Sequence, residues 1–310
     1  MYRVAIIRKG RLLLGIQFHI LRKKPYNLVE PSNRLLPVRC CFDMKLQHLF
    51  SIVLVLVFGI HSLWGQGAID GYMKGRGNTD VAVSYAREGY DVYNFGAEPR
   101  PVDIRINSIG FFIEHGVNDS IDLVFTTAYL DLDPQNRGIQ DAILALKYRN
   151  QYRKFRNGGS WTTLTAVGLG FPLGGYSTET TNPIGERALS FQARLVGQYQ
   201  SPNGVFAQLQ SGFDFRIEPQ NLFAVPVLVR AGWAGRFLYA DAWLERYQTL
   251  NSGTNTQIAG GEGSSWWKVG STLYVPISGS FGVVANVARI LGGENIGEST
   301  RLGGGVVVRL

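Results

Sequence analysis

Residues able to catalyse a reaction are few in this sequence of 310 residues. Histidine occurs four times, and only His115 lies beyond the first 65 residues. A hydrolytic centre needs a serine or aspartate nucleophile that is served by a positioned histidine. His115 stands beside Glu114, and a histidine near a turn is the simpler interpretation. We therefore predict no catalytic residue, and a hydrolase remains the remote alternative.

Motifs for metals and nucleotides are equally sparse. Asp131, Asp133 and Asn136 could offer oxygen atoms to Ca²⁺, but the segment lacks the full ligand set of a dedicated loop. The glycine runs at 260–263 and 303–305 lack the lysine and the strand-to-helix context of a phosphate-binding loop. We predict no metal site and no cofactor.

The remaining candidates are charged residues of both signs that alternate with apolar residues in strand-like segments. In a barrel such residues would face the lumen, where they could line a narrow aqueous path or pair across it and close it. Mixed signs argue against strong ion selectivity, which uses rings of one sign. The candidates for the lining are Asp141, Lys147, Arg149, Arg194, Asp214, Arg216, Asp241, Glu245 and Lys268.

These residues must be positioned by strands, because apolar and polar residues alternate with period two. In 205–216, Val205, Leu209 and Phe213 share one face, whereas Gln208 and Asp214 share the other. The segment 161–172 alternates poorly, and its faces stay unassigned. The predicted strands cover 79–93, 102–116, 121–133, 139–150, 161–172, 189–200, 205–216, 222–233, 237–247, 266–276, 281–291 and 299–310.

The connections between these strands alternate in length. Tight turns such as Ser201–Gly204 follow every second strand, and long polar connections such as 173–188 and 248–265 follow the others. The basic connection at 151–160 is the exception, since it should be a short turn. Short turns at one end and long loops at the other are typical of bacterial outer-membrane barrels. The fold class predicted is all-β: a transmembrane antiparallel up-and-down β-barrel of about 12 strands, with ten as the alternative count.

Aromatic residues fall near both ends of the predicted strands. Tryptophan and tyrosine favour the two membrane interfaces, where their amphipathic rings form girdles. With the chain starting in the periplasm, the order of the strands predicts a periplasmic girdle of Tyr148, Trp161, Tyr199 and Trp233 and an outer girdle of Tyr129, Tyr247, Trp266 and Trp267.

An export signal precedes the strands. The apolar run 49–60 has the length of a signal-peptide core and is too short to span a bilayer comfortably. We expect a cleavable Sec-type signal peptide at 44–65 and an outer-membrane β-barrel at 66–310. Residues 1–43 hold nine basic and two acidic residues. They are interpreted as an over-extended gene start, with a long basic leader as the alternative.

Charge and cysteine content exclude further classes. Beyond Gln66 the chain has 21 basic and 21 acidic residues, so the basic pI reflects the upstream segment and no nucleic-acid partner is expected. Cys40 and Cys41 also lie upstream, which leaves the exported part without disulfides or thiol chemistry.

The last strand carries apolar residues at Val306, Val308 and Leu310. This pattern resembles the C-terminal assembly signal of bacterial barrels, although that signal usually ends in phenylalanine or tryptophan. The partners expected are therefore outer-membrane lipid, the barrel-assembly machinery and a small-molecule solute.

The sequence between residues 138 and 176 contains motifs that are more specific to one family. Gly138 and Asp141 open a strand that closes on Lys-Tyr-Arg at 147–149, and the next strand closes on Phe-Pro-Leu-Gly at 171–174. These motifs resemble the outer-membrane barrel family associated with the meta pathway of phenol degradation. The resemblance implies passage of small hydrophobic or aromatic molecules. A passive channel is thus the function we favour, and a structural or surface-interaction barrel with a plugged lumen is the alternative.

Overall fold

The computed structural model describes residues 69–134, 136–178, 184–217, 221–252 and 263–310. The predicted signal peptide at 44–65 and the basic segment at 1–43 lie outside these residues. Among the described residues, no helix is long and apolar enough to cross a membrane.

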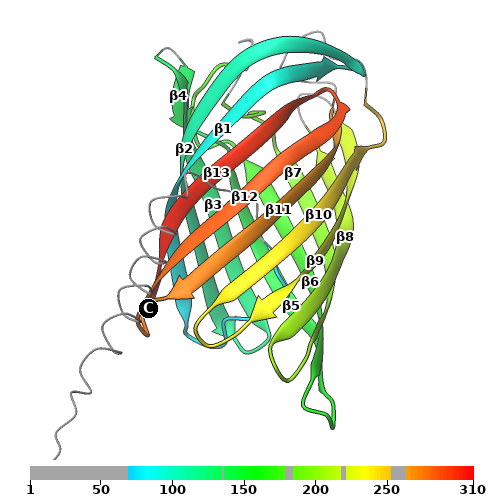
Figure 1. Ribbon diagram of the computed structural model, residues 1–310. Helices are drawn as coiled ribbons and strands as arrows, with labels where there is room; N and C mark the ends of the chain where they lie inside the picture. Colours follow the sequence, from blue (N-terminus) through cyan, green and yellow to red (C-terminus); the bar gives the residue numbers. More distant parts are fainter. Residues whose placement is uncertain (1–68, 135, 179–183, 218–220, 253–262) are drawn as a thin grey trace, which may run out of the picture. The chain divides into compact units, whose positions relative to one another are not determined.

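Twelve long antiparallel strands and one short strand, β4, make up a single closed sheet in the described part of the chain (Figure 1). Each long strand pairs with the next along the chain, and β1 pairs with β13 to close the barrel. The strands are β1 Thr79–Phe95, β2 Glu98–Asn118, β3 Ile121–Asp133, β4 Asn136–Ile139, β5 Ala142–Lys154, β6 Ser160–Phe171, β7 Ser190–Gln200, β8 Val205–Arg216, β9 Leu222–Ala234, β10 Tyr239–Thr249, β11 Ser265–Pro276, β12 Phe281–Glu294 and β13 Ile296–Arg309.

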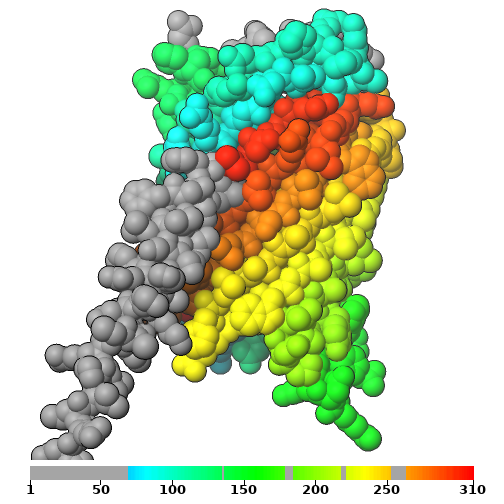
Figure 2. Space-filling view, viewed as in Figure 1, coloured from blue at the N-terminus to red at the C-terminus, as the bar shows by residue number. Residues whose placement is uncertain are grey.

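The predicted all-β barrel of about 12 strands is confirmed, and two of its details are wrong. The strand predicted at 139–150 corresponds to β5, which starts at Ala142 and runs on to Lys154, and a separate short strand, β4, precedes it and pairs with the end of β3. The predicted long connection at 151–160 is a tight turn. Gly158 has a φ of 85°, and the backbone N–H of Phe155 donates to the carbonyl of Gly159. The basic residues therefore lie on a hairpin that projects beyond the rim, as Figure 2 shows in green.

The two ends of the barrel differ only in part as the alternation predicted. At the short-turn end, the connections after β2, β5, β7, β9 and β11 are tight turns. At the long-loop end, residues 172–189 and 250–264 connect strands. The other connections at that end are shorter: residues 96–97 join β1 to β2, residues 134–135 join β3 to β4, residues 217–221 join β8 to β9, and Asn295 alone separates β12 from β13.

The wall has an apolar outside and a polar inside. Leu195, Leu209 and Val229 are 60%, 57% and 53% exposed on the outer face. Gln208 and Arg230, on the opposite face of the same strands, are buried in the barrel. An apolar exterior around a polar lumen is the pattern of a barrel whose outer surface faces lipid.

Candidate functional site

The lumen at the short-turn end is occupied by residues 69–78, which precede β1 and are named here the N-terminal segment. Its first residue, Ile69, is buried in an apolar cluster on the inner wall. That cluster consists of Val124, Ala145, Leu164, Ala166 and Val196 from β3, β5, β6 and β7. The contact explains why 161–172 alternates poorly: the inward face of β6 is apolar where it packs on Ile69.

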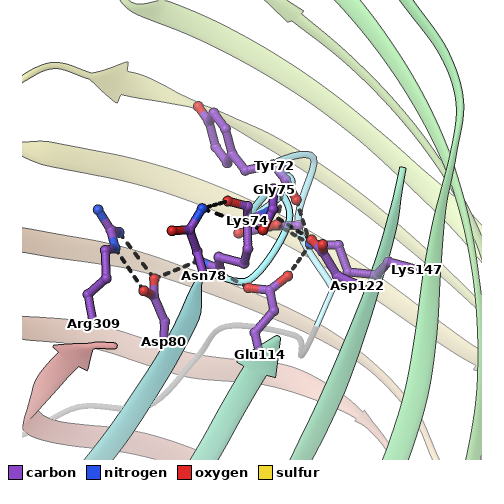
Figure 3. Close-up of polar contacts among 10 residues, drawn as sticks. Tyr72, Lys74, Gly75, Asn78, Asp80, Glu114, Asp122, Lys147 and Arg309 are labelled. Carbon is purple, nitrogen blue, oxygen red and sulfur yellow. Dashed lines mark hydrogen bonds and ion pairs between the residues drawn. The ribbon is translucent and has the colours of Figure 1, made fainter. Parts of the chain in front are cut away.

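An ionic network ties the N-terminal segment to the wall (Figure 3). The Lys147 ammonium, fully buried on β5, lies 2.8 Å from the Asp70 carboxylate and 2.5 Å from the Glu114 carboxylate. It also donates to the carbonyl oxygen of Tyr72 at 2.6 Å. The backbone N–H of Lys74 donates to Asp122 at 2.9 Å. One lysine of the wall thus holds the side chain and the backbone of the segment.

Lys74 of the N-terminal segment neutralises two carboxylates of the barrel wall. Asp80 on β1 is the direct cross-strand partner of Glu114 on β2, and like charges in that position destabilise a sheet. The Lys74 ammonium lies between them, 2.8 Å from Asp80 and 3.1 Å from Glu114. Arg309 on the last strand pairs with Asp80 as well, at 2.9 Å. The segment therefore supplies a cation that the wall needs.

The electrostatics of the segment reflect these contacts. Although burial acts in the opposite direction, the ammonium groups of Lys147 and Lys74 lower the pKa of Asp70 to about 2. Burial likewise disfavours the charged form of Lys74, but the carboxylates of Glu114, Asp70 and Asp80 raise its pKa above the ordinary value. Both groups therefore remain ionised at neutral pH.

A close backbone approach fixes the turn at residues 75–78. The N–H of Gly77 donates to the carbonyl of Gly116 on β2, and the N–H of Gly116 donates to the carbonyl of Asn78. A Cβ at position 116 would overlap the carbonyl oxygen of Gly75. Only glycine at position 116 allows the segment to lie this close to the wall.

Gly116→Ala is expected to push the N-terminal segment away from β2, because the new Cβ would overlap the backbone of Gly75, which has no flexible side chain to move aside. We expect a larger single-channel conductance in planar bilayers and a loss of about 1–3 kcal/mol in stability. Gly279→Ala is the matched control, since a Cβ at that turn meets no atom within 4 Å. Equal conductance of the two variants would contradict the expectation.

A cavity of about 890 Å³ remains beside the N-terminal segment. It begins at the turn residues Arg236 and Ser278 of the short-turn end and reaches Thr126 and Ile143 deeper in the lumen. Lys74, Asp80 and Arg309 also line it, so its surface carries both signs of charge. The segment thus narrows the lumen without filling it.

Tyr72 extends from the segment to the opposite wall. Its ring meets those of Phe206 on β8 and Tyr239 on β10 edge-on, with centroids 5.8 and 6.3 Å away. Phe206 and Tyr239 stack on each other at 5.5 Å. Edge-on and offset-stacked arrangements are the favourable ones for aromatic pairs. The segment is therefore held on both sides of the lumen.

Further charges lie nearer the long-loop end. Arg194 pairs with Asp214 at 2.7 Å, and Arg301 pairs with Glu88 at 3.2 Å. Pairing across strands is the baseline expected for charges in such an interior. Among the described residues, the charged side chains that face the lumen at this level include Glu88, Arg194, Asp214, Glu245, Lys268 and Arg301.

The described ends of the connection between β6 and β7 lie inside the barrel near the long-loop end. Tyr176 and Ile184 of this connection are buried against the inward-facing Leu130 of β3. The Tyr176 hydroxyl donates to the Asp141 carboxylate, which also accepts from the backbone N–H of Arg187 at 3.0 Å. Burial and the hydrogen bond to Asp141 raise the pKa of Tyr176. The lumen is therefore narrowed at both ends.

The structure separates the nine predicted lining residues into three groups. Asp141 holds the inward-folded connection, and Arg149 lies at the short-turn rim with its guanidinium over the Tyr152 ring. Arg216 pairs with Glu186 of the same connection at 3.0 Å. The other six face the lumen: Lys147, Arg194, Asp214, Asp241, Glu245 and Lys268.

The predicted girdle residues do not all face outward. Tyr247 and Trp266 stack at 5.2 Å, and the Lys268 ammonium lies 5.6 Å from the Trp266 ring. Both rings share the inward face of Glu245 and Lys268, so their assignment to the lipid interface is wrong. The others lie on the outer face: Tyr129, Tyr148, Trp161, Tyr199, Trp233 and Trp267.

The N-terminal segment was not predicted to be part of the site. Asp70, Tyr72 and Lys74 were missed because they lie outside the strand pattern. Glu114 was considered only as a neighbour of His115, whereas it points into the lumen and binds both lysines. His115 accepts or donates a hydrogen bond with the Thr79 hydroxyl at 2.8 Å. The available signal was the presence of an acidic and a basic residue just before the first strand.

Comparison with solved structures identifies the fold. The COG4313 outer membrane channel from Pseudomonas putida F1 aligns with a TM-score of 0.60 and 13% identity, covering 79% of this chain and 100% of that chain. The fold is that of an outer-membrane β-barrel. The NanC porin aligns with a TM-score of 0.51 and 8% identity, covering 75% of this chain and all of the porin. The apolar exterior fits the same location in the bacterial outer membrane.

Comparisons with protein-family models and with curated proteins give no match.

Proposed function

We propose that the chain is a passive outer-membrane channel for small solutes. The observation that supports this most directly is the cavity of about 890 Å³ that runs from the short-turn rim past the N-terminal segment. The polar groups in its lining offer hydrogen-bond partners to a solute, and the paired charges of both signs favour weak ion selectivity.

The solute class follows from the resemblance in the sequence. Small hydrophobic or aromatic molecules are the proposed cargo, as in the barrel family associated with phenol degradation. The rings of Tyr72, Phe206 and Tyr239 support an aromatic solute, because two of them line the cavity. Outer-membrane lipid around the apolar belt and the barrel-assembly machinery acting on β13 are the proposed partners.

Reconstitution tests the proposal. The purified barrel in liposomes should admit small solutes and in planar bilayers should show discrete conductance steps. A plugged barrel is the second candidate, because the N-terminal segment and the connection of 172–189 both narrow the lumen. A barrel that stays silent and sealed under all voltages would favour that alternative.

A disulfide tether tests whether the N-terminal segment limits the flow. A Cβ on Gly71 would lie 2.9 Å from that of Gln198 on β7, so a Gly71→Cys/Gln198→Cys pair needs only a small adjustment to reach the usual separation of ~3.8 Å. The exported part contains no native cysteine to compete. We expect the oxidised protein to keep the low conductance when moderate denaturant raises that of the reduced protein. Identical responses would show that the segment does not control the path.

A further inference from the structure

Arg230 is a fully buried cation on the inward face of β9. Its side chain is fully buried, and within the described residues none of its guanidinium nitrogens has a hydrogen-bond partner. Its ion-pair partner is Asp241 on β10, whose Oδ2 lies 3.5 Å from the Arg230 Nε. That separation is too long for a good hydrogen bond.

Asp241 is committed to other groups. It accepts from the Tyr239 hydroxyl at 2.7 Å and from the backbone N–H of Thr272 at 2.8 Å. A guanidinium carries five N–H donors in a planar fork that matches a carboxylate. Leaving buried charged donors unmet is costly. The guanidinium N–H groups of Arg230 are therefore available to a further hydrogen-bond acceptor.

Neighbouring strands present more unmet polar atoms at the same level. Gln208 on β8 and Trp243 on β10 are the cross-strand neighbours of Arg230. The Oε1 atoms of Gln198 and Gln208 and the Nε1 of Trp243 are buried without a hydrogen-bond partner in the described part of the chain. The inner wall from β7 to β10 thus forms a polar surface that its own side chains leave partly unsatisfied.

Tyr72 covers this surface. Its ring lies edge-on to those of Phe206 and Tyr239, and the Tyr239 hydroxyl donates to Asp241, the ion-pair partner of Arg230. Tyr72 belongs to the N-terminal segment and not to the wall. Withdrawal of the segment would therefore leave a space of one aromatic ring, bounded by Phe206 and Tyr239 and close to the Arg230–Asp241 pair.

We propose that Arg230 anchors a binding site for a small aromatic carboxylate and that Tyr72 occupies the place of its ring. The carboxylate accepts two N–H groups of Arg230, and the ring takes the edge-on position against Phe206 and Tyr239. Asp241 keeps its bonds to Tyr239 and Thr272. The proposal rests on the proposed channel function, for which it names a solute class and a site.

Calorimetric titration of the full chain in detergent micelles tests the site without requiring transport. Benzoate is the probe, with benzyl alcohol as its neutral counterpart and acetate as a carboxylate without a ring. Tyr72→Ala should bind benzoate about tenfold or more tightly than the unaltered chain, equivalent to ~1.4 kcal/mol, because no phenol has to be displaced. It should bind both control probes far more weakly than benzoate.

Variants at position 230 provide the second comparison. Tyr72→Ala/Arg230→Gln should lose about ten- to a hundredfold in benzoate affinity, as expected for charge-assisted hydrogen bonds. Tyr72→Ala/Arg230→Lys keeps the positive charge but lacks the planar set of N–H donors, so it should bind benzoate with intermediate affinity. It also tests the role of position 230 if the glutamine variant fails to fold.

Two results would overturn the site: no benzoate binding by Tyr72→Ala, or equal affinity for benzoate and benzyl alcohol. Benzoate binding by a barrel that admits no solute into liposomes would refute the channel function and leave the site standing. Solute flux without benzoate binding would do the reverse.

Discussion

Lys147→Met should release the N-terminal segment from the lumen and lower the free energy of unfolding by about 3–5 kcal/mol, the usual cost of removing one partner from a buried ion pair. Lys147 is the most buried cation of the network and binds Asp70, Glu114 and the carbonyl of Tyr72. Methionine has similar length and fills the space, so the change removes charge rather than packing. The carboxylates of Asp70 and Glu114 would then repel each other.

Two measurements check this expectation. Heat-modifiable gel mobility reports the temperature at which the barrel unfolds, and planar-bilayer recording reports whether the conductance rises as the segment leaves. Lys154→Met is the matched control, because Lys154 lies exposed on the same strand. Its effect should stay within ~0.5 kcal/mol, as is usual for surface substitutions. A Lys147→Met barrel as stable and as narrow as this control would refute the role of the network.

Deletion of residues 69–76 should widen the channel most strongly while leaving a closed barrel. All twelve long strands begin at Thr79 or later, so every strand pairing survives. The deletion removes Ile69, Tyr72 and Lys74 together, which opens the lumen on both sides of the segment. We expect single-channel conductance to increase several-fold and larger solutes to enter liposomes.

The same deletion should carry a measurable stability cost. The inner cluster around Leu164 would meet water, and loss of Ile69 burial alone is worth about 1.5–3 kcal/mol. Asp80 and Glu114 would also face each other without Lys74. Lys74→Met separates the two effects, because it removes the cation and keeps Ile69 and Tyr72 in place. Unchanged conductance after deletion would mean that the connection of 172–189 sets the limit.

The fold was predictable because a barrel repeats a local rule. Alternation of apolar and polar residues identifies each strand, and the strand 205–216 has those bounds in the structure. The short strand β4 was not predictable, because its pairing with the end of β3 depends on neighbouring residues and not on alternation. The tight turn at Gly158 was missed because basic residues on the hairpin had the composition of a loop.

The site was less accessible to prediction. Lys147 and Asp70 are separated by 77 positions, and nothing in either local pattern connects them. The error at Tyr247 and Trp266 was avoidable. Tyr247 has the same parity as Glu245, and Trp266 the same parity as Lys268, and both charged residues were already placed in the lumen. The face of a strand, and not the position along it, decides whether an aromatic ring meets lipid.

Asp80 has a consequence for the order of assembly. It lies where the first strand meets the last, and it binds both Arg309, which is 229 positions away, and Lys74, which is six positions away. The local contact can form as soon as β1 is made, whereas the distant one must wait for the whole chain, since contacts of large sequence separation form slowly. Lys74 can therefore neutralise Asp80 while the sheet is still open. The contact between Lys74 and Asp80 therefore also protects the open edge of β1, because it keeps the Asp80 carboxylate paired until β13 completes the barrel.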